Sequence, residues 1–127
     1  MQTVFTPQAP KPAGHYSQAV IHGDLVFVSG QLAIDPQTGE KRIGSIEEQT
    51  ELVLRNVAAI LKAANSGPDR VIKTVVYISD IGLWERVNKV YADFFGEHRP
   101  ARAVVPTREL HFGFQIEMEA IAAIDHR

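Results

Sequence analysis

The stretch QIEMEAIAAI at residues 115–124 decides the fold of this chain. Apolar residues occupy every second position, which is the pattern of a β-strand whose side chains alternate between two faces. The intervening positions hold two glutamates followed by Ile121 and Ala123, so the second face is partly apolar as well. A strand that is apolar on both faces belongs to a sheet that is covered on both sides.

Further strands are expected upstream, at residues 16–23, 23–34, 71–80 and 101–110. The first two form a hairpin, because Gly23-Asp24 supplies a tight turn between two alternating runs. The run at 71–80, VIKTVVYISD, is rich in β-branched residues, which favour strands. A short additional strand is a candidate near Ile43. Residues 1–15 carry three prolines and are expected to form an extended arm.

Two helices separate these strands. The first runs from Ser45 to about Ala64, where Ser45 and Glu48 form a capping box and Gly67-Pro68 follows the end. The second runs over about residues 83–96 with an apolar stripe of helical period. The apolar positions of the two stripes are Ile46, Val53, Val57, Ile60, Leu61 and Ala64, then Leu83 or Trp84, Val87, Tyr91 and Phe94 or Phe95.

The order β-β-α-β-α-β-β predicts an α+β fold in which both helices pack on one face of a mixed sheet. We expect residues 1–127 to form a single domain. Two helices cover one face only, whereas the strands are apolar on both. Because an exposed apolar sheet face is unfavourable in water, we expect a second copy of the chain to cover the other face as a homo-oligomer.

Composition excludes several classes of function. The 127 residues carry a formal net charge of -2, and the 13 Lys and Arg residues are scattered, so nucleic-acid binding is not expected. The absence of cysteine removes disulfides, thiol nucleophiles and cysteine metal sites. No apolar run is long enough for a membrane span and the first residues lack a signal-peptide pattern, so we expect a cytoplasmic protein.

Individual residues that could perform chemistry are ambiguous. Tyr16 is compatible with an ordinary surface position, Arg102 with an edge ion pair, and Asn88 with an exposed helix position. Glu117 interrupts an apolar strand, where a charged residue needs a partner or solvent. Glu119 shares its face, and nothing intrinsic decides which glutamate would act. The five histidines lack metal-ligand spacing, and Gly30 alone makes no phosphate loop, so neither a metal nor a cofactor is expected.

The combination of motifs is more specific than any one residue. PARAVVPTREL (residues 100–110) followed by IEMEAIA (116–122) closely resembles the signature of the RidA/YjgF family. The stretches that match the same family in the same order are GHYSQAV (14–20), VSGQLAIDPQTGE (28–40), TVVYISD (74–80) and VNKVYADFF (87–95). The resemblance spans essentially the whole chain.

This resemblance implies a chorismate-mutase-like fold and a homotrimer, built around a barrel core, with an active site in each cleft between subunits. Deaminating members hydrolyse 2-imino and 2-enamino acids to a 2-oxo acid and ammonia, without a metal or cofactor. The family's substrate-binding Arg falls on Arg102, its acidic residue on Glu117, and its Tyr on Tyr16. Its Asn falls on Asn88, and backbone groups around Gly30 and just after Arg102, at Val104, are expected to line the cleft.

Those residue types suit the reaction. A guanidinium binds a carboxylate bidentately and fixes the orientation of the C=N carbon. A carboxyl group can orient water and transfer protons. Burial would raise the pKa of Glu117 and a nearby Arg102 would lower it, so its protonation is left open. Alternatives are a non-catalytic binder of small carboxylates and a ribonuclease or translation inhibitor. His15, the stretch 96–99 and the aromatic loop 111–115, where Phe112 or Phe114 could narrow the pocket, bear on substrate preference.

Overall fold

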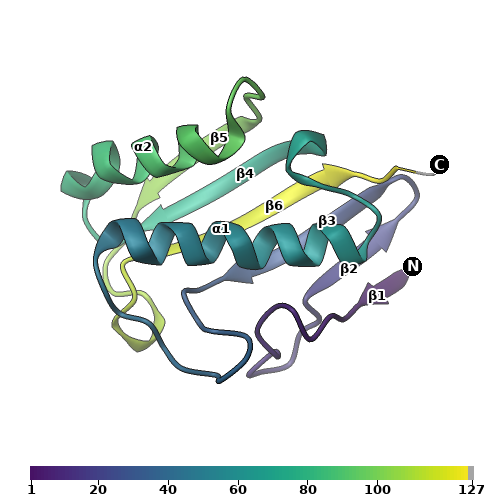
Figure 1. The fold of residues 1–127 in the computed structure, drawn as a ribbon, viewed down its shortest axis with the longest axis horizontal. Coiled ribbons are helices and arrows are strands. Elements are labelled where there is room, and N and C mark those ends of the chain that lie inside the picture. Colours follow the sequence, from purple (N-terminus) through teal and green to yellow (C-terminus); the bar gives the residue numbers. More distant parts are fainter. Residues whose placement is uncertain (126–127) are drawn as a thin grey trace.

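A computed structural model describes residues 1–125 (Figure 1). Six strands form one sheet in the order β1-β2-β3-β6-β4-β5. Only β4 and β5 pair in parallel, so the sheet is mixed. The strands are β1 (Gln2–Val4), β2 (Ala19–His22), β3 (Leu25–Gln31), β4 (Val71–Ile78), β5 (Ala101–Pro106) and β6 (Ile116–Ala123), and the helices are α1 (Ile46–Ala63) and α2 (Trp84–Phe95).

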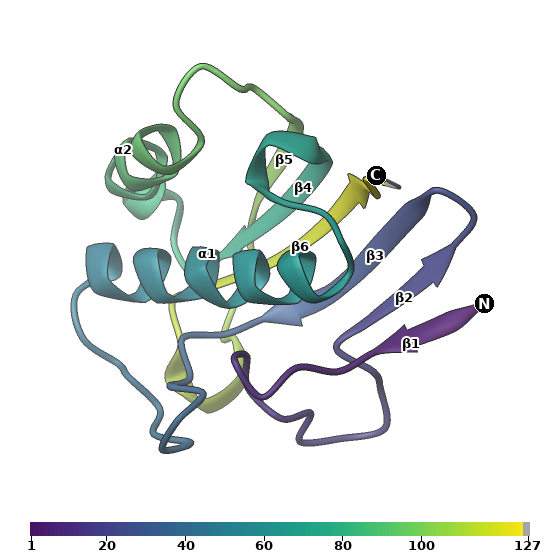
Figure 2. The ribbon, with the colours of Figure 1, turned by 45° about the vertical axis from the view of Figure 1, so that its right-hand side comes forward.

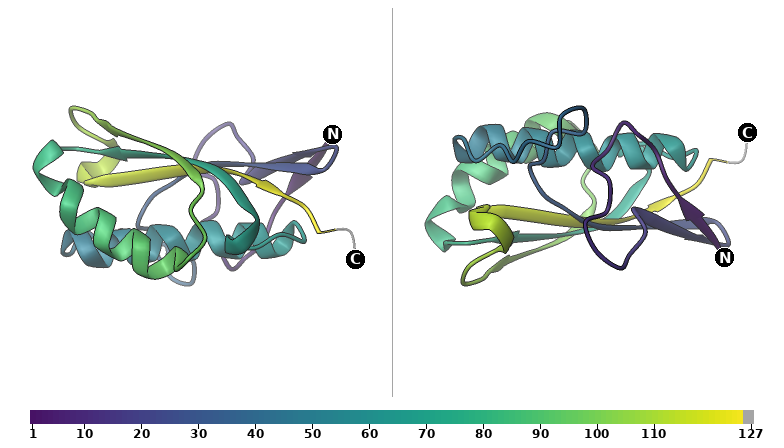
Figure 3. Two further views of the ribbon diagram at one scale, coloured as in Figure 1. Left: turned by 90° about the horizontal axis from the view of Figure 1, so that it is seen from above. Right: turned by 90° about the horizontal axis from the view of Figure 1, so that it is seen from below.

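The expected α+β arrangement is confirmed, with both helices on one face of the mixed sheet. Viewed along its edges, the sheet carries α1 and α2 on the same side and no helix on the other (Figure 3). Figure 2 shows α1 crossing β6 and β3 while α2 lies toward β4 and β5. Burial follows these two faces along β6, because Ile116, Met118 and Ala120 are buried whereas Glu117 and Glu119 are only partly covered.

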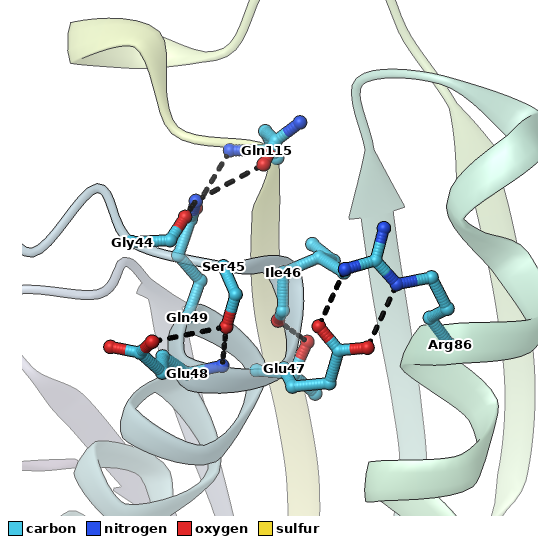
Figure 4. Close-up of polar contacts among 9 residues, drawn as sticks. Gly44, Ser45, Ile46, Glu47, Glu48, Gln49, Arg86 and Gln115 are labelled. Atoms are coloured by element: carbon cyan, nitrogen blue, oxygen red, sulfur yellow. Dashed lines mark hydrogen bonds and ion pairs between the residues drawn. The ribbon is translucent and has the colours of Figure 1, made fainter.

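The start of α1 shows why a helix begins there (Figure 4). The Ser45 hydroxyl oxygen accepts a hydrogen bond from the Glu48 amide at 3.1 Å, as the capping pattern predicts. The Glu48 carboxylate accepts from the Ser45 hydroxyl at 3.2 Å, a contact that differs from the usual reciprocal bond to the cap amide. The buried Gln49 donates to the Gly44 carbonyl and accepts from the Gln115 amide, so one side chain joins α1 to the start of β6.

Strand β3 contains a β-bulge that sequence alternation does not reveal. Val28 pairs with Ala120 and Gln31 with Met118, so three steps on β3 oppose two on β6. The extra residue turns Gly30 toward the face that bears Glu117. Simple alternation along the strand predicts the opposite face, the one that bears Val28. Glycine at this position lets the Glu117 carboxylate lie directly against the backbone, because a methyl group at the α-carbon would displace it.

The face without helices is largely apolar in its outer part. Phe27 is 41% exposed and Val105 is 38% exposed. In the register of the sheet Phe27 is flanked by Val20 and Ile121, which extends the apolar surface over three strands. This bare face is the one for which the sequence predicted a second cover.

Two further details of the sequence prediction were wrong. The N-terminal arm begins with strand β1, which pairs antiparallel with β2 at the edge of the sheet. The buried Gln18 then holds the arm by hydrogen bonds to the backbone of Thr6, Ala9 and Pro10. No strand forms near Ile43, where an isolated bridge joins Ile34 to Lys41.

Candidate active site

One group of candidate residues lies on the bare face. Glu117 on β6 packs against the backbone of Gly30 on β3, so the bulge and the carboxyl are brought together. Glu119 lies on the same strand and face, and its carboxylate accepts a hydrogen bond of 2.6 Å from the Tyr77 hydroxyl on β4. Within residues 1–125 no such hydrogen bond engages the Glu117 carboxyl. Glu119 is therefore already paired, whereas Glu117 is available to a ligand.

The electrostatic surroundings of Glu117 raise its pKa. Partial burial is the main cause, because it disfavours the charged form, and the neighbouring Glu119 carboxylate adds to the effect. His111 acts weakly in the opposite direction. Arg102, which the sequence had suggested as a lowering influence, is not among the groups that act on Glu117 in this chain. Within one chain, the pKa of Glu117 is therefore higher than that of an ordinary glutamate.

A second group lies on the helix-covered side, where β5 forms the edge of the sheet. Arg102 is paired in register with the buried Thr74 and extends under α2. Its guanidinium donates to the Asn88 side-chain oxygen at 2.8 Å. The same guanidinium carbon lies 4.8 Å from the centre of the Tyr91 ring and 5.6 Å from that of Trp84. Cation–π contacts and one hydrogen bond therefore fix the direction of this cation.

A cavity of about 510 Å³ opens beside Arg102. It lies between the C-terminal half of α2 and the chain leading into β5. Its polar lining includes Asn88, His98, Arg99 and Arg102, and its apolar lining includes Tyr91 and Phe95. A pocket with convergent cationic groups on an apolar wall suits a small organic anion.

The two groups do not meet within one chain. Arg102 lies on the helix-covered side of β5, Glu117 lies on the bare face of β6, and β4 separates the two strands. No single-chain cleft unites them in the described residues. A site that uses both residues must draw them from two copies of the chain.

The remaining candidates are dispersed. Tyr16 is half exposed in the loop before β2, where its hydroxyl accepts a hydrogen bond of 3.4 Å from the Ala13 amide. The Val104 side chain is partly buried and packs against the core on the same face of β5 as Arg102. Phe114 is in the core and cannot narrow a pocket. Phe112 is exposed and stacks on His111 at 3.6 Å between ring centres.

Several relevant residues escaped the sequence analysis. Tyr77 was read only as part of a β-branched strand, yet its position opposite Glu117 in the register brings its hydroxyl to Glu119. Tyr91 and Trp84 were assigned to the apolar stripe of α2. Trp84 is in fact 38% exposed, and both rings flank Arg102. Aromatic residues four positions before and three positions after Asn88, on the same face of a helix, were the available signal.

In residues 1–125, no group of three or more His, Asp or Glu side chains is arranged to hold a metal ion. No helix in that same range is both long and apolar enough to cross a membrane.

Comparison with known proteins decides the family. The profile of the family described as Endoribonuclease L-PSP matches residues 6–124. A RutC family protein of Pyrococcus abyssi is 46% identical over 121 residues, covering 95% of each chain. Reactive Intermediate Deaminase A of Arabidopsis thaliana, a chloroplastic protein, is 39% identical and is matched over 97% of this chain and 66% of its own length. The chain belongs to the RidA/YjgF family.

Solved structures of relatives have the same fold. A putative endoribonuclease of Thermotoga maritima superposes with a TM-score of 0.95 at 47% identity, covering 98% of both chains. RidA from the Antarctic bacterium Psychrobacter gives 0.93 at 40% identity, covering 98% of this chain and all of the other. TdcF of E. coli, solved with bound serine, gives 0.93 at 38% identity with the same coverage. This RidA/YjgF member therefore shares its entire sheet and both helices with relatives, one of which was solved with a small amino acid.

Proposed function

We propose that this protein is a cofactor-free hydrolytic deaminase of 2-imino and 2-enamino acids. The observation that carries the proposal is the pair of preorganised half-sites, a fixed cation at Arg102 and an available carboxyl at Glu117. Family membership supports it, because one relative is named a reactive intermediate deaminase.

Arg102 is the proposed carboxylate-binding group. Its guanidinium is held by Asn88 and the rings of Trp84 and Tyr91, so little side-chain entropy remains to be lost when a 2-imino acid binds. A planar guanidinium can bind the substrate carboxylate bidentately. That contact places the C=N carbon at a defined distance from groups at the opposite wall of the cleft.

Glu117 is the proposed acid–base group. Water adds its oxygen to the imine carbon while nitrogen gains a proton, which gives a tetrahedral carbinolamine. The nitrogen then receives a second proton, the C–N bond breaks and ammonia leaves, while the carbinol hydroxyl loses its proton and becomes the carbonyl of the 2-oxo acid. A positioned carboxyl that supplies the proton to nitrogen typically contributes about 10² to 10⁴ in rate. Tyr16 would close the cleft over the substrate, and backbone groups near Gly30 and Val104 would complete it.

The two half-sites require an assembly. We infer that a second copy lays its β5 edge over the bare face, so that Arg102 of one subunit meets Glu117 of the next. Three such contacts close into a ring, which is the chorismate-mutase-like trimer that the family resemblance implies. This arrangement also buries the apolar surface around Phe27 and Val105. Residues 1–127 would act in it as one domain, in the cytoplasm.

The first test is imine decay trapped with semicarbazide. An L-amino acid oxidase or a threonine dehydratase generates 2-iminopropanoate or 2-iminobutanoate in place. We expect the wild-type protein to shorten the lifetime of the imine, and Arg102→Ala and Glu117→Ala to lose that effect while the assembly persists. Arg86→Ala and Glu51→Gln, on exposed helix surfaces, serve as charge-matched controls that retain activity. Loss of assembly in Arg102→Ala would make Arg102 an interface residue and overturn its proposed role.

Mixing the two inactive variants tests the shared site. If each site takes Arg102 and Glu117 from different subunits, subunit exchange restores both residues in about a quarter of the sites of a random trimer. Activity that reappears on mixing supports the shared site. Activity that stays absent after verified exchange contradicts it.

A second candidate is a non-catalytic binder of small carboxylates. It is favoured by the bound serine of TdcF and by the cavity beside Arg102. Calorimetry with 2-oxo acids and amino acids separates the candidates when combined with the decay assay. Binding that depends on Arg102, without any acceleration of imine decay, would favour the binder.

A further inference from the structure

Two carboxyl groups share the bare face, and within residues 1–125 only Glu119 has a hydrogen-bond partner. Glu117 and Glu119 are two residues apart on β6, so their side chains lie on the same face of the sheet. Tyr77 of β4 is directly opposite Glu117 in the register. The Tyr77 hydroxyl nevertheless donates to Glu119, at 2.6 Å. Two neighbouring carboxyls that interact bind their protons unequally, because the second negative charge is disfavoured by the first. A hydrogen-bond donor attached to one of them decides where the proton stays.

We propose that the hydrogen bond from the Tyr77 hydroxyl to Glu119 assigns the proton of the carboxyl pair to Glu117. A hydroxyl that donates to a carboxylate stabilises its charged form. The Glu119 charge then disfavours a second charge at Glu117, which is packed against the Gly30 backbone and has no donor of its own among the described residues. Tyr77 and Glu119 are positioning residues that act through Glu117.

The ionisation tendencies of the three groups agree with this assignment. The pKa of Glu117 is raised by burial and then by Glu119. The pKa of Tyr77 is raised chiefly by its hydrogen bond to Glu119, so the phenol keeps its proton and stays a donor. Within one chain, the other charged or titratable groups around the cluster are His111, which lowers the pKa of Glu117, and the exposed Lys73, farther along β4. In the proposed assembly Arg102 of the next subunit also faces Glu117, with its guanidinium engaged by the substrate carboxylate.

The consequence for chemistry rests on the proposed function. A protonated Glu117 can give its proton to the departing nitrogen of the carbinolamine and become a carboxylate, which then takes up the proton that the carbinol hydroxyl releases as it becomes the carbonyl. A pair without Tyr77 would place the proton on either carboxyl. A fraction of sites would then hold their acid at Glu119, which is displaced by two residues along the strand. The phenol thus sets which carboxyl serves as the acid.

The test measures the carboxyls directly. Carbon-13 NMR of the glutamate side chains follows the titration of Glu117 and Glu119 in the assembled protein, in wild type, Glu119→Gln and Tyr77→Phe, with Glu51→Gln as a control on α1. We expect Glu117 to titrate at higher pH than Glu119 in wild type and to move to lower pH in Glu119→Gln. Tyr77→Phe removes only a hydroxyl. In this variant the carboxyl carbons of both Glu117 and Glu119 should shift in each of the two deprotonation steps of the pair, because the two carboxyls share the remaining proton.

Activity gives an independent reading. The alkaline limb of the kcat/KM profile should move to lower pH in Glu119→Gln, with a several-fold loss at pH values above the new limb and little change in acid. The proton assignment is overturned if Glu119 titrates above Glu117 in wild type, or if neither variant changes the titration of Glu117. If the titrations move as expected but wild type does not accelerate imine decay, the proton assignment stands and the deaminase proposal fails.

Discussion

The two faces of the sheet differ in how completely their side chains are buried and hydrogen-bonded within one chain. On the helix-covered face of β6, apolar side chains are sealed under α1 and α2, and the buried polar residue Thr74 beneath them bonds to Tyr91 at 2.7 Å. On the bare face, apolar side chains are partly exposed and Glu117 lacks a hydrogen-bond donor within the described chain. The covered face is complete within one chain. The bare face remains partly exposed in one chain, and we propose that another copy covers it and that the chemistry takes place there.

Truncation of the covered core should have the largest effect. Met118 is 1% exposed and lies beneath the helices. The substitution Met118→Ala should lower the free energy of unfolding of the protein by about 2–5 kcal/mol, because it leaves a cavity that the helices cannot fill. Urea unfolding at several protein concentrations measures this. The matched variant Ile121→Ala, three residues along on the bare face, should instead make the midpoint more dependent on concentration. Equal, concentration-independent losses would show that the two faces do not differ.

A charge on the bare face should break the assembly. Phe27→Asp places an unpaired carboxylate in the apolar surface between Val20 and Ile121, a cost of about 2 kcal/mol or more if that surface lies at the centre of an interface. Sedimentation velocity should show smaller particles with native circular dichroism. Ile81→Asp, at an exposed apolar residue between β4 and α2, should leave the mass unchanged. An intact assembly in Phe27→Asp would move the interface elsewhere.

The buried polar contacts on the helix-covered side should contribute measurably to the free energy of unfolding, although they are few. Gln49→Leu removes the side chain that joins Gly44 to Gln115 and leaves the Gln115 amide without its acceptor, a cost of about 1–3 kcal/mol. Thermal unfolding should show a clearly lower midpoint. Gln37→Leu, at an exposed side chain in the turn after β3, is the control and should change little. A neutral result for Gln49→Leu would mean that water replaces the lost contacts.

The contribution of the Glu117 carboxyl to the stability of the folded protein should decrease as the pH rises. Its pKa is raised in the folded state, so its favourable contribution is complete below the ordinary carboxyl pKa and is lost as pH rises through the raised value. Glu117→Gln cannot ionise, so its stability relative to wild type should increase with pH across that window, by less than the Gln49 effect. Thermal midpoints in acid and at neutral pH measure this. A constant difference would contradict the raised pKa.

The smallest effect should come from the ion pair outside both faces. Arg86 donates to Glu47 at 2.7 and 2.8 Å and lowers the pKa of that carboxyl to about 2, but both side chains are about half exposed. A lowered carboxyl pKa contributes stability above its ordinary value that is lost as pH falls toward about 2. Arg86→Ala should therefore change the thermal midpoint slightly at neutral pH and not at all in strong acid or high salt. A large loss would contradict this solvent screening.

The two faces also mark how far prediction from sequence could reach. Local signals were sufficient for the helices, because caps and the 3.6-residue period act within a few residues of each other. Ser45, Val57 and Ile60 lie where the pattern placed them. The β-bulge before Gln31 and the strand at residues 2–4 depend on a partner strand that is distant in sequence, and no local pattern encodes that partner.

By itself, the sequence determined the α+β class and the apolar character of both sheet faces, since alternation and helical period follow from backbone geometry alone; the second copy over the bare face stays a prediction. The sequence also pointed to Arg102 and Glu117 through a family signature. Only the tertiary structure decided that these residues lie on opposite faces, that Tyr77 bonds to Glu119 rather than Glu117, and that Asn88, Trp84 and Tyr91 fix Arg102. The reason is that strand order and register set which side chains meet, and these arise from contacts across the whole chain.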